Sequence, residues 1–101
     1  MKLTEADRLS KEEVTAELTA LGPEWEFCEK HNAIEKDFTR KNFLDSVSFI
    51  EKIAPLAEKA DHHPDLLLHD YKSVRVILTT HSAHGITEND FALARAIESI
   101  A

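Results

Sequence analysis

The segment from residue 42 to residue 60 carries the most regular pattern in this chain. Its apolar side chains recur at intervals of four and three residues, the period of one face of an α-helix; they are Phe43, Val47, Ile50, Ala54 and Ala57. Pro55 lies within the segment, where it removes a backbone hydrogen bond at a cost of about 3 kcal/mol. The stripe is widened toward a second face by Ile53, Leu56 and Ala60. Because the apolar stripe continues on both sides of the proline, we predict one helix over 42–60 with this stripe facing the core.

Short segments typical of β-strands lie on both sides of this helix. Residues 24–28 and 33–39 precede it, and residues 66–71 and 74–80 follow it. In the last segment valine and leucine side chains occupy every second position, which is the period of a strand with one buried face. A tight turn near Lys72-Ser73 joins the last two segments. We therefore predict two β-hairpins separated by the long helix.

Capping patterns predict a further helix near each end of the chain. Ser10 and Glu13 form a capping box at the start of a helix over residues 11–20. Thr87-Glu88-Asn89-Asp90 opens another helix, whose core face carries Leu93, Ile97 and Ile100. The element order is then α-β-β-α-β-β-α. We predict a single α+β domain over 1–101, with a four-stranded antiparallel sheet and three helices packed on one face.

The composition is that of an ordinary globular chain, with 43% hydrophobic and 31% charged residues. The formal net charge of −7 argues against a protein that grips nucleic acid directly. No apolar run approaches the length of a membrane span, and the N-terminus lacks a signal-peptide pattern. Cys28 is the only cysteine, so no internal disulfide can form. We expect a cytoplasmic protein without direct contacts to nucleic acid or membrane.

Histidine is over-represented, and its placement suggests proton-transfer chemistry. Five of the six histidines lie between residues 62 and 84. If the fourth strand returns along its hairpin, His81 at its end comes back to His62 and His63 at the start of the third strand. Imidazole, with an ordinary pKa of about 6.5, is the side chain best suited to exchanging protons near neutral pH. Carboxylates that could orient these rings lie nearby in Glu58, Asp61 and Asp90.

Other interpretations of these residues remain open. Individual histidines commonly cap helix ends or fill turns without a further role. A metal site is weakly supported, because the side chains of adjacent histidines diverge and His81-x-x-His84 alone is a poor signal. Cys28 is far in sequence from the five histidines between residues 62 and 84, and it is interpreted as a small buried hydrophobic residue. General acid–base chemistry on an uncharged or weakly charged small molecule is the interpretation that we favour.

Several motifs follow one another at fixed spacing: Glu58-Lys59-Ala60-Asp61-His62-His63-Pro64-Asp65, then Tyr71, then Thr79-Thr80-His81, then Gly85-Ile86-Thr87-Glu88-Asn89-Asp90. Together they resemble the signature of the pterin-4a-carbinolamine dehydratases. Trp25 and the pair Phe38 and Phe43 are also placed as in this family, so the resemblance covers nearly the whole chain. It implies a four-stranded antiparallel sheet with three helices on one face, the same fold that the element order predicts.

The resemblance also implies a reaction. Members of the family remove water from a 4a-hydroxytetrahydropterin to give quinonoid dihydropterin, which recycles the pterin cofactor of aromatic amino acid hydroxylases. No metal or organic cofactor takes part. By resemblance His62, His63 and His81 are the catalytic histidines, with His62 and His81 exchanging protons and His63 orienting the substrate. Pocket roles are carried over to Asp61, Thr79, Thr80 and Ser82, and support of the histidines to Glu58 and Asp90.

The resemblance implies partners as well as a substrate. Family members self-associate, so a homodimer or homotetramer is expected, and an aromatic amino acid hydroxylase is a candidate partner. Leu66-Leu67-Leu68 departs from the usual pattern and predicts one exposed leucine, which an oligomer interface would cover. Some animal members also act as dimerisation cofactors of a homeodomain transcription factor. The alternative function is therefore a non-catalytic binding module with the same fold.

Overall fold

Four antiparallel strands form one sheet in the computed structural model, which describes residues 3–101. The order across the sheet is β1-β2-β4-β3, so the second strand of each hairpin lies in the centre. The strands are β1 (Glu26–Cys28), β2 (Ala33–Thr39), β3 (Asp65–His69) and β4 (Ser73–Leu78). Their register joins the two hairpins through β2 and β4, with Ile34 opposite Leu78 and Phe38 opposite Val74.

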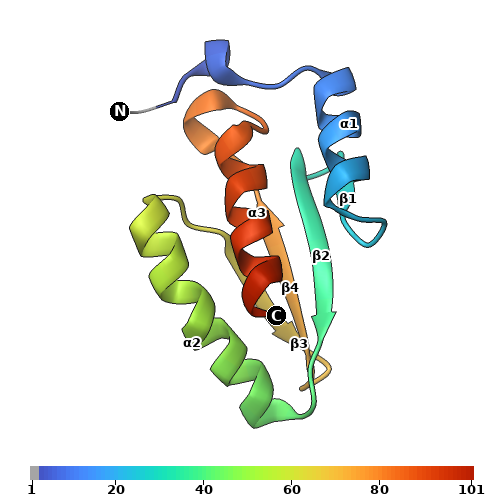
Figure 1. Cartoon of the computed structure of the whole chain (residues 1–101), viewed down its shortest axis with the longest axis vertical. Coiled ribbons are helices and arrows are strands. Elements are labelled where there is room, and N and C mark those ends of the chain that lie inside the picture. Colours follow the sequence, from blue (N-terminus) through green and yellow to red (C-terminus); the bar gives the residue numbers. More distant parts are fainter. Residues whose placement is uncertain (1–2) are drawn as a thin grey trace.

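Three α-helices pack on one face of this sheet (Figure 1). They are α1 (Lys11–Leu21), α2 (Phe43–Ala60) and α3 (Glu88–Ile100). Two short 3-10 helices, η1 (Glu5–Asp7) and η2 (His81–Ala83), were not predicted. The predicted α+β fold and the order α-β-β-α-β-β-α are confirmed, and α2 runs unbroken through Pro55. Among the helices formed by residues 3–101, none is both long enough and apolar enough to cross a membrane.

The core lies between the helices and the inward face of the sheet. The alternation predicted for β4 is confirmed, because Val74, Val76 and Leu78 are all fully buried. Trp25 is buried as well, and its ring meets Phe38 edge-on at a centroid distance of 6.0 Å. This aromatic contact ties the first hairpin to the helices, because Phe38 in turn packs on a phenylalanine of α2.

The buried face of α2 differs from the predicted stripe. The residues that face the core are Ser46, Phe49, Ile53 and Ala57, whereas Phe43 is 54% exposed and Ala54 is also exposed. Phe49 determines this orientation, because its ring lies 5.1 Å from that of Phe38. A serine is tolerated in the core since its hydroxyl donates to the carbonyl oxygens of Asn42 and Tyr71.

Strand β2 has the predicted bounds, whereas the other three strands are shorter than predicted. Strand β1 begins only at Glu26, and Phe27, expected on a buried face, is 42% exposed. The turn between β3 and β4 spans residues 70–72, because Asp70 and Tyr71 both adopt left-handed backbone conformations. Tyr71 is therefore in the turn and exposed, not in the predicted strand. Leu67 is the exposed leucine that the Leu66-Leu67-Leu68 run predicts.

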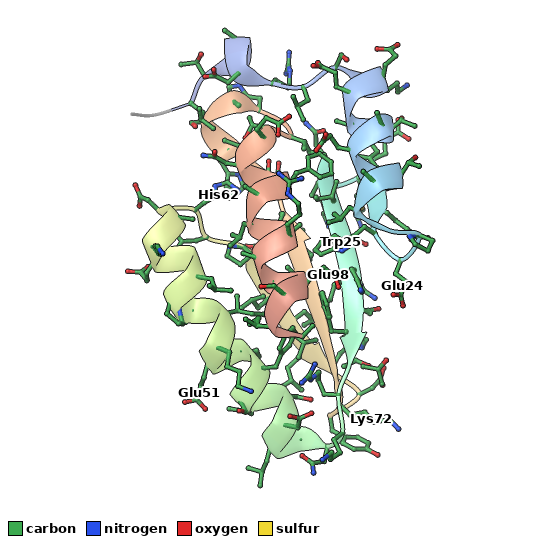
Figure 2. The ribbon with its side chains drawn as sticks, viewed as in Figure 1. Glu24, Trp25, Glu51, His62, Lys72 and Glu98 are labelled. Carbon is green, nitrogen blue, oxygen red and sulfur yellow. The ribbon has the colours of Figure 1, made fainter. Side chains whose placement is uncertain are left out.

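A charged residue on the inward face is neutralised locally. Lys36 lies between Ile34 and Phe38 on the core side of β2, and its Nζ is 2.5 Å from Oε2 of Glu98. The same carboxylate oxygen accepts a hydrogen bond from Nε1 of Trp25 at 2.8 Å (Figure 2). Because the ammonium group is paired with a carboxylate, its burial beside the aromatic core is tolerated.

The opposite face of the sheet carries a polar cluster near β3. Arg75 donates from Nε and Nη2 to the two carboxylate oxygens of Asp37, at 3.0 and 3.1 Å. His69 lies beside this pair, with Nε2 3.0 Å from Asp37 and Nδ1 3.0 Å from Asp70. The hydrogen bond to Asp37, reinforced by the one to Asp70, raises the pKa of His69 above its ordinary value.

Protonation of His69 is therefore expected to stabilise the fold. Since the folded-state pKa is raised above an unfolded value of about 6.5, this stabilisation is complete below that pH and is lost as the pH rises through the raised pKa. Urea unfolding of the unmodified protein and of His69→Gln, followed from about pH 5 to about pH 9, measures the effect. The difference in unfolding free energy should shrink as the pH rises, and a constant difference would contradict the assignment.

Candidate active site

The end of α2 turns His62 toward the start of α3. Asp61 adopts a left-handed conformation (φ 50°) that stops the helix, and the N–H of His62 bonds back to the Ala57 carbonyl at 3.1 Å. Aspartate tolerates this conformation better than most residues. Pro64 restricts the residue before it to extended backbone, so His63 cannot continue the helix. Figure 2 shows His62 between the end of α2 and the first turns of α3.

A buried carboxylate lies at the start of α3. Thr87 is the N-cap residue, and its backbone N–H donates to Oδ2 of Asp90 at 2.9 Å, which confirms the predicted cap. Asp90 is fully buried. Its negative charge lies in the first helical turn, where the unpaired N–H groups and the helix dipole favour an anion.

Side chains from separate parts of the chain converge on Asp90. Nε2 of His62 lies 2.5 Å from Oδ1 of Asp90, and the Thr80 hydroxyl donates to Oδ2 at 2.8 Å. The Thr80 and Thr87 hydroxyl oxygens are 2.9 Å apart. We call these four residues the Asp90 network. It joins the segment between α2 and β3, the end of β4 and the start of α3, which lie together because β4 runs back along β3.

The donors and acceptors of the network fix its proton positions. Thr80 has one hydroxyl proton and gives it to Asp90, so the Thr87 hydroxyl must donate to Thr80. An ionised carboxylate only accepts, so Nε2 of His62 carries the proton shared with Asp90. A neutral imidazole with its proton on Nε2 has its lone pair on Nδ1. The arrangement can therefore hold one ring in a fixed orientation and tautomer, ready to exchange a proton through Nδ1.

His81 follows this network directly in sequence. It opens η2, immediately after Thr80, and it is exposed. Reciprocal backbone hydrogen bonds between Thr80 and Gly85 close the loop around it. Nδ2 of Asn32, in the turn between β1 and β2, donates to the carbonyl of His84 at 2.8 Å. The loop that presents His81 is thus anchored to the first hairpin.

The residues at the end of α2 form a second, more exposed pair. Nε2 of His63 is 2.5 Å from Oε2 of Glu58, and both side chains are largely exposed. Asp61 is exposed at the helix end. The structure thus pairs His63 with Glu58, one of the carboxylates that the sequence offered as supports for the histidines, one residue away from His62.

Two other predicted pocket residues lie apart from Asp90. Thr79 is adjacent to Thr80 in an extended segment, so its side chain points to the opposite side, where the hydroxyl donates to the Asn32 carbonyl at 2.8 Å. Ser82 is half-buried within η2. Neither shares a hydrogen bond with the Asp90 network among the described residues.

Sequence reasoning identified Thr87 only as a helix cap. The structure adds that its hydroxyl supports Thr80 within the site. The signal was present in the spacing, because a capping threonine three residues before Asp90 must lie against that carboxylate. What the spacing did not show was that a second threonine, at the end of β4, meets the same group.

Comparison with known proteins identifies the family. The family model described as pterin 4 alpha carbinolamine dehydratase matches residues 7–100 of this chain. The chain belongs to the pterin-4a-carbinolamine dehydratase family. A Chloroflexus aggregans protein given this name is 47% identical over 93 residues, covering 92% of this chain and 96% of its own. An Aquifex aeolicus protein of the same name is 46% identical over 93 residues, and the match covers 92% of this chain and 90% of that protein. The activity in these names is that of a hydro-lyase.

A solved structure agrees with the fold. The crystal structure of a transcriptional coactivator/pterin dehydratase from Brucella melitensis superposes with a TM-score of 0.85. It is 38% identical in sequence, and the match covers 93% of this chain and 98% of that one. The family resemblance inferred from residues 58–90 is therefore confirmed, and the relatives have nearly the same extent as this chain.

Proposed function

We propose that this protein catalyses the dehydration of a 4a-hydroxytetrahydropterin to the quinonoid dihydropterin, and thereby serves the recycling of the pterin cofactor of aromatic amino acid hydroxylases. Family membership supports the reaction class. The observation that carries the assignment to this site is the hydrogen bond between His62 and the fully buried Asp90. A buried carboxylate that fixes one tautomer of a neighbouring imidazole is a common means of preparing a histidine for proton transfer.

The reaction needs one proton removed and one supplied. The lone pair of the ring nitrogen next to C4a forms the new C=N bond, the C4a–O bond breaks, and the oxygen leaves as water. In our proposal Nδ1 of His62 accepts the proton of that ring nitrogen, while His81 protonates the departing hydroxyl. Solvent then returns both histidines to their starting states. Each proton transfer of this kind accelerates a reaction by about 10²–10⁴-fold.

The remaining predicted residues orient the substrate in this proposal. His63, held by Glu58, lies one residue from His62 and can contact a ring bound there. Asp61 and Ser82 flank the two catalytic histidines in sequence and offer polar atoms to the amino and carbonyl groups of a pterin. The hydroxyl of Thr79 is engaged with Asn32, so its contribution would be to anchor the loop that carries His81.

Binding of a stable dihydropterin tests the position of this site. We expect 7,8-dihydrobiopterin to shift the imidazole NMR signals of His62, His63 and His81. The signals of His69 should not move, because that ring lies on the opposite face of the sheet beside Asp37. Shifts confined to His69, or no shifts at saturating ligand, would contradict the proposed site.

We also propose that the protein self-associates. Phe43 and Leu44 at the start of α2 are 54% and 78% exposed, and the hydroxyl of Ser46 links this end of the helix to the carbonyl of the exposed Tyr71. An apolar patch of this kind on a small domain is typical of an interface. In the alternative function, a non-catalytic binding module, the patch of Phe43 and Leu44 would bind a protein partner instead of a second copy of this chain.

Mutation of the patch separates these outcomes. Leu44→Glu is expected to convert a homodimer or homotetramer into monomers, since it buries a charge in the interface. Sedimentation equilibrium of the variant and of Lys41→Glu, an exposed neighbour outside the helix, measures the assembly state. Sedimentation of the unmodified protein as a monomer would contradict self-association.

A further inference from the structure

The first β-hairpin brings three potential metal ligands together, away from the Asp90 network. Cys28 ends β1, His31 lies in the turn, and Glu35 is in β2. The sulfur of Cys28 is 3.5 Å from Nδ1 of His31, and the same nitrogen is 3.7 Å from Oε2 of Glu35. All three ligand atoms lie within 4.8 Å of one another. The site therefore contains one thiol, one imidazole and one carboxylate.

These separations are close to those of a tetrahedral zinc centre. Zinc binds cysteine sulfur at about 2.3 Å and histidine nitrogen or carboxylate oxygen at about 2.0–2.2 Å, which places neighbouring ligand atoms about 3.3–3.6 Å apart. The distances from His31 to Cys28 and to Glu35 already approach this range. The remaining separation, between the Cys28 sulfur and the Glu35 carboxylate, is within 4.8 Å.

The carboxylate of Glu35 has no hydrogen-bond donor at this point among the described residues, although His31 and Arg75 lie close enough to attract it. Oε2 of Glu35 is buried and accepts no hydrogen bond from any residue between 3 and 101. Glu26 lies directly opposite it in the β1–β2 register, and like charges in opposed positions destabilise a sheet. Arg75, on the same face, donates to Asp37 instead. A bound cation is one way to satisfy a buried carboxylate oxygen that has no donor within the described part of the protein.

We propose that Cys28, His31 and Glu35 bind a divalent transition-metal ion of the zinc class. The ligands are the Cys28 thiolate, Nδ1 of His31 and Oε2 of Glu35, with the fourth position open to water. Binding releases the thiol proton to solvent, so affinity rises with pH. None of these residues belongs to the Asp90 network, so no ligand of the proposed metal takes part in the proposed dehydration. Asn32 connects the two regions, because it follows His31 and donates to the loop of His81.

Cobalt(II) is the probe that tests this site. Titration of the full chain with Co²⁺ should give one equivalent of a complex with a thiolate-to-cobalt charge-transfer band and the visible bands of tetrahedral cobalt, and Zn²⁺ should displace it. Cys28→Ser should lose the charge-transfer band. His31→Gln and Glu35→Gln should each weaken binding by about tenfold or more. Glu29→Gln, an exposed position in the same turn, is the matched control and should bind like the unmodified protein.

Two outcomes would overturn the proposal. One is an unmodified protein with no charge-transfer band at excess Co²⁺. The other is a cobalt spectrum that survives in Cys28→Ser, which would place the metal on histidines elsewhere in the chain. A second measurement guards against misfolded variants: Zn²⁺ should raise the melting temperature of the unmodified protein and of Glu29→Gln, but not that of Cys28→Ser.

Discussion

Replacing His62 with alanine is expected to slow the dehydration of 4a-hydroxytetrahydropterin by about 10²–10⁴-fold, the range for loss of a general acid or base. His62 is the ring that Asp90 orients, and in the proposal its Nδ1 exchanges a proton with the substrate. The fold should survive, because Asp90 keeps the donors Thr80 and Thr87 when the ring is removed. The rate of quinonoid dihydropterin formation, followed by ultraviolet absorbance, measures the effect.

His69→Ala is the matched control for this experiment. It also removes a histidine paired with a carboxylate, but one on the opposite face of the sheet. We expect its dehydration rate to equal that of the unmodified protein. An equal loss in both variants would show that activity follows stability, and full activity in His62→Ala would remove this residue from the mechanism.

Replacing Asp90 with alanine is expected to lower the free energy of unfolding by about 3 kcal/mol or more, because each buried hydrogen-bonding group left without its partner costs about 1–3 kcal/mol. The Asp90 carboxylate accepts hydrogen bonds from His62, from the Thr80 hydroxyl and from the Thr87 N–H. The substitution removes this acceptor from all three groups. Urea denaturation measures the change. Glu88→Ala, an exposed acidic residue in the same helical turn, should shift the unfolding free energy by only about 0.5 kcal/mol.

Asp90→Asn separates the catalytic role of the carboxylate from its structural role. The asparagine carbonyl can still accept from Thr80 and from the Thr87 N–H, while its NH₂ group donates to Nε2 of His62. His62 must then carry its proton on Nδ1, the wrong tautomer for a base at that nitrogen. We expect Asp90→Asn to be more stable than Asp90→Ala but similarly inactive. An active Asp90→Asn would contradict the tautomer argument.

The fold could be predicted because its local signals agree. The caps at Ser10 and Thr87 and the strict alternation in β4 each specify one element, and α2 tolerates Pro55 as its flanking pattern indicates. The buried face of α2 could not be read in the same way. Apolar residues occupy more than one side of that helix. The side that faces the core is the one that carries Phe49, whose ring packs on Phe38 of β2, a contact between two elements that the pattern within the helix does not show.

The candidate site could be predicted only in part. The return of β4 along β3 follows from the hairpin, and it brings Thr80 to the region of His62. Both Thr79 and Thr80 were predicted to line the pocket. The alternation along β4 that buries Leu78 also points Thr80 inward and Thr79 outward, so this signal could have separated them. The position of Tyr71 was missed because two consecutive left-handed residues are rarely expected outside glycine or asparagine.

Turnover by the unmodified protein tests the central claim most directly. The 4a-hydroxytetrahydropterin is generated in situ with a chelator present, and formation of the quinonoid dihydropterin is compared with and without the protein. The expected result is a dehydration rate well above the spontaneous one and proportional to protein concentration. A rate equal to the spontaneous one, from protein shown to be folded, would contradict the proposed function.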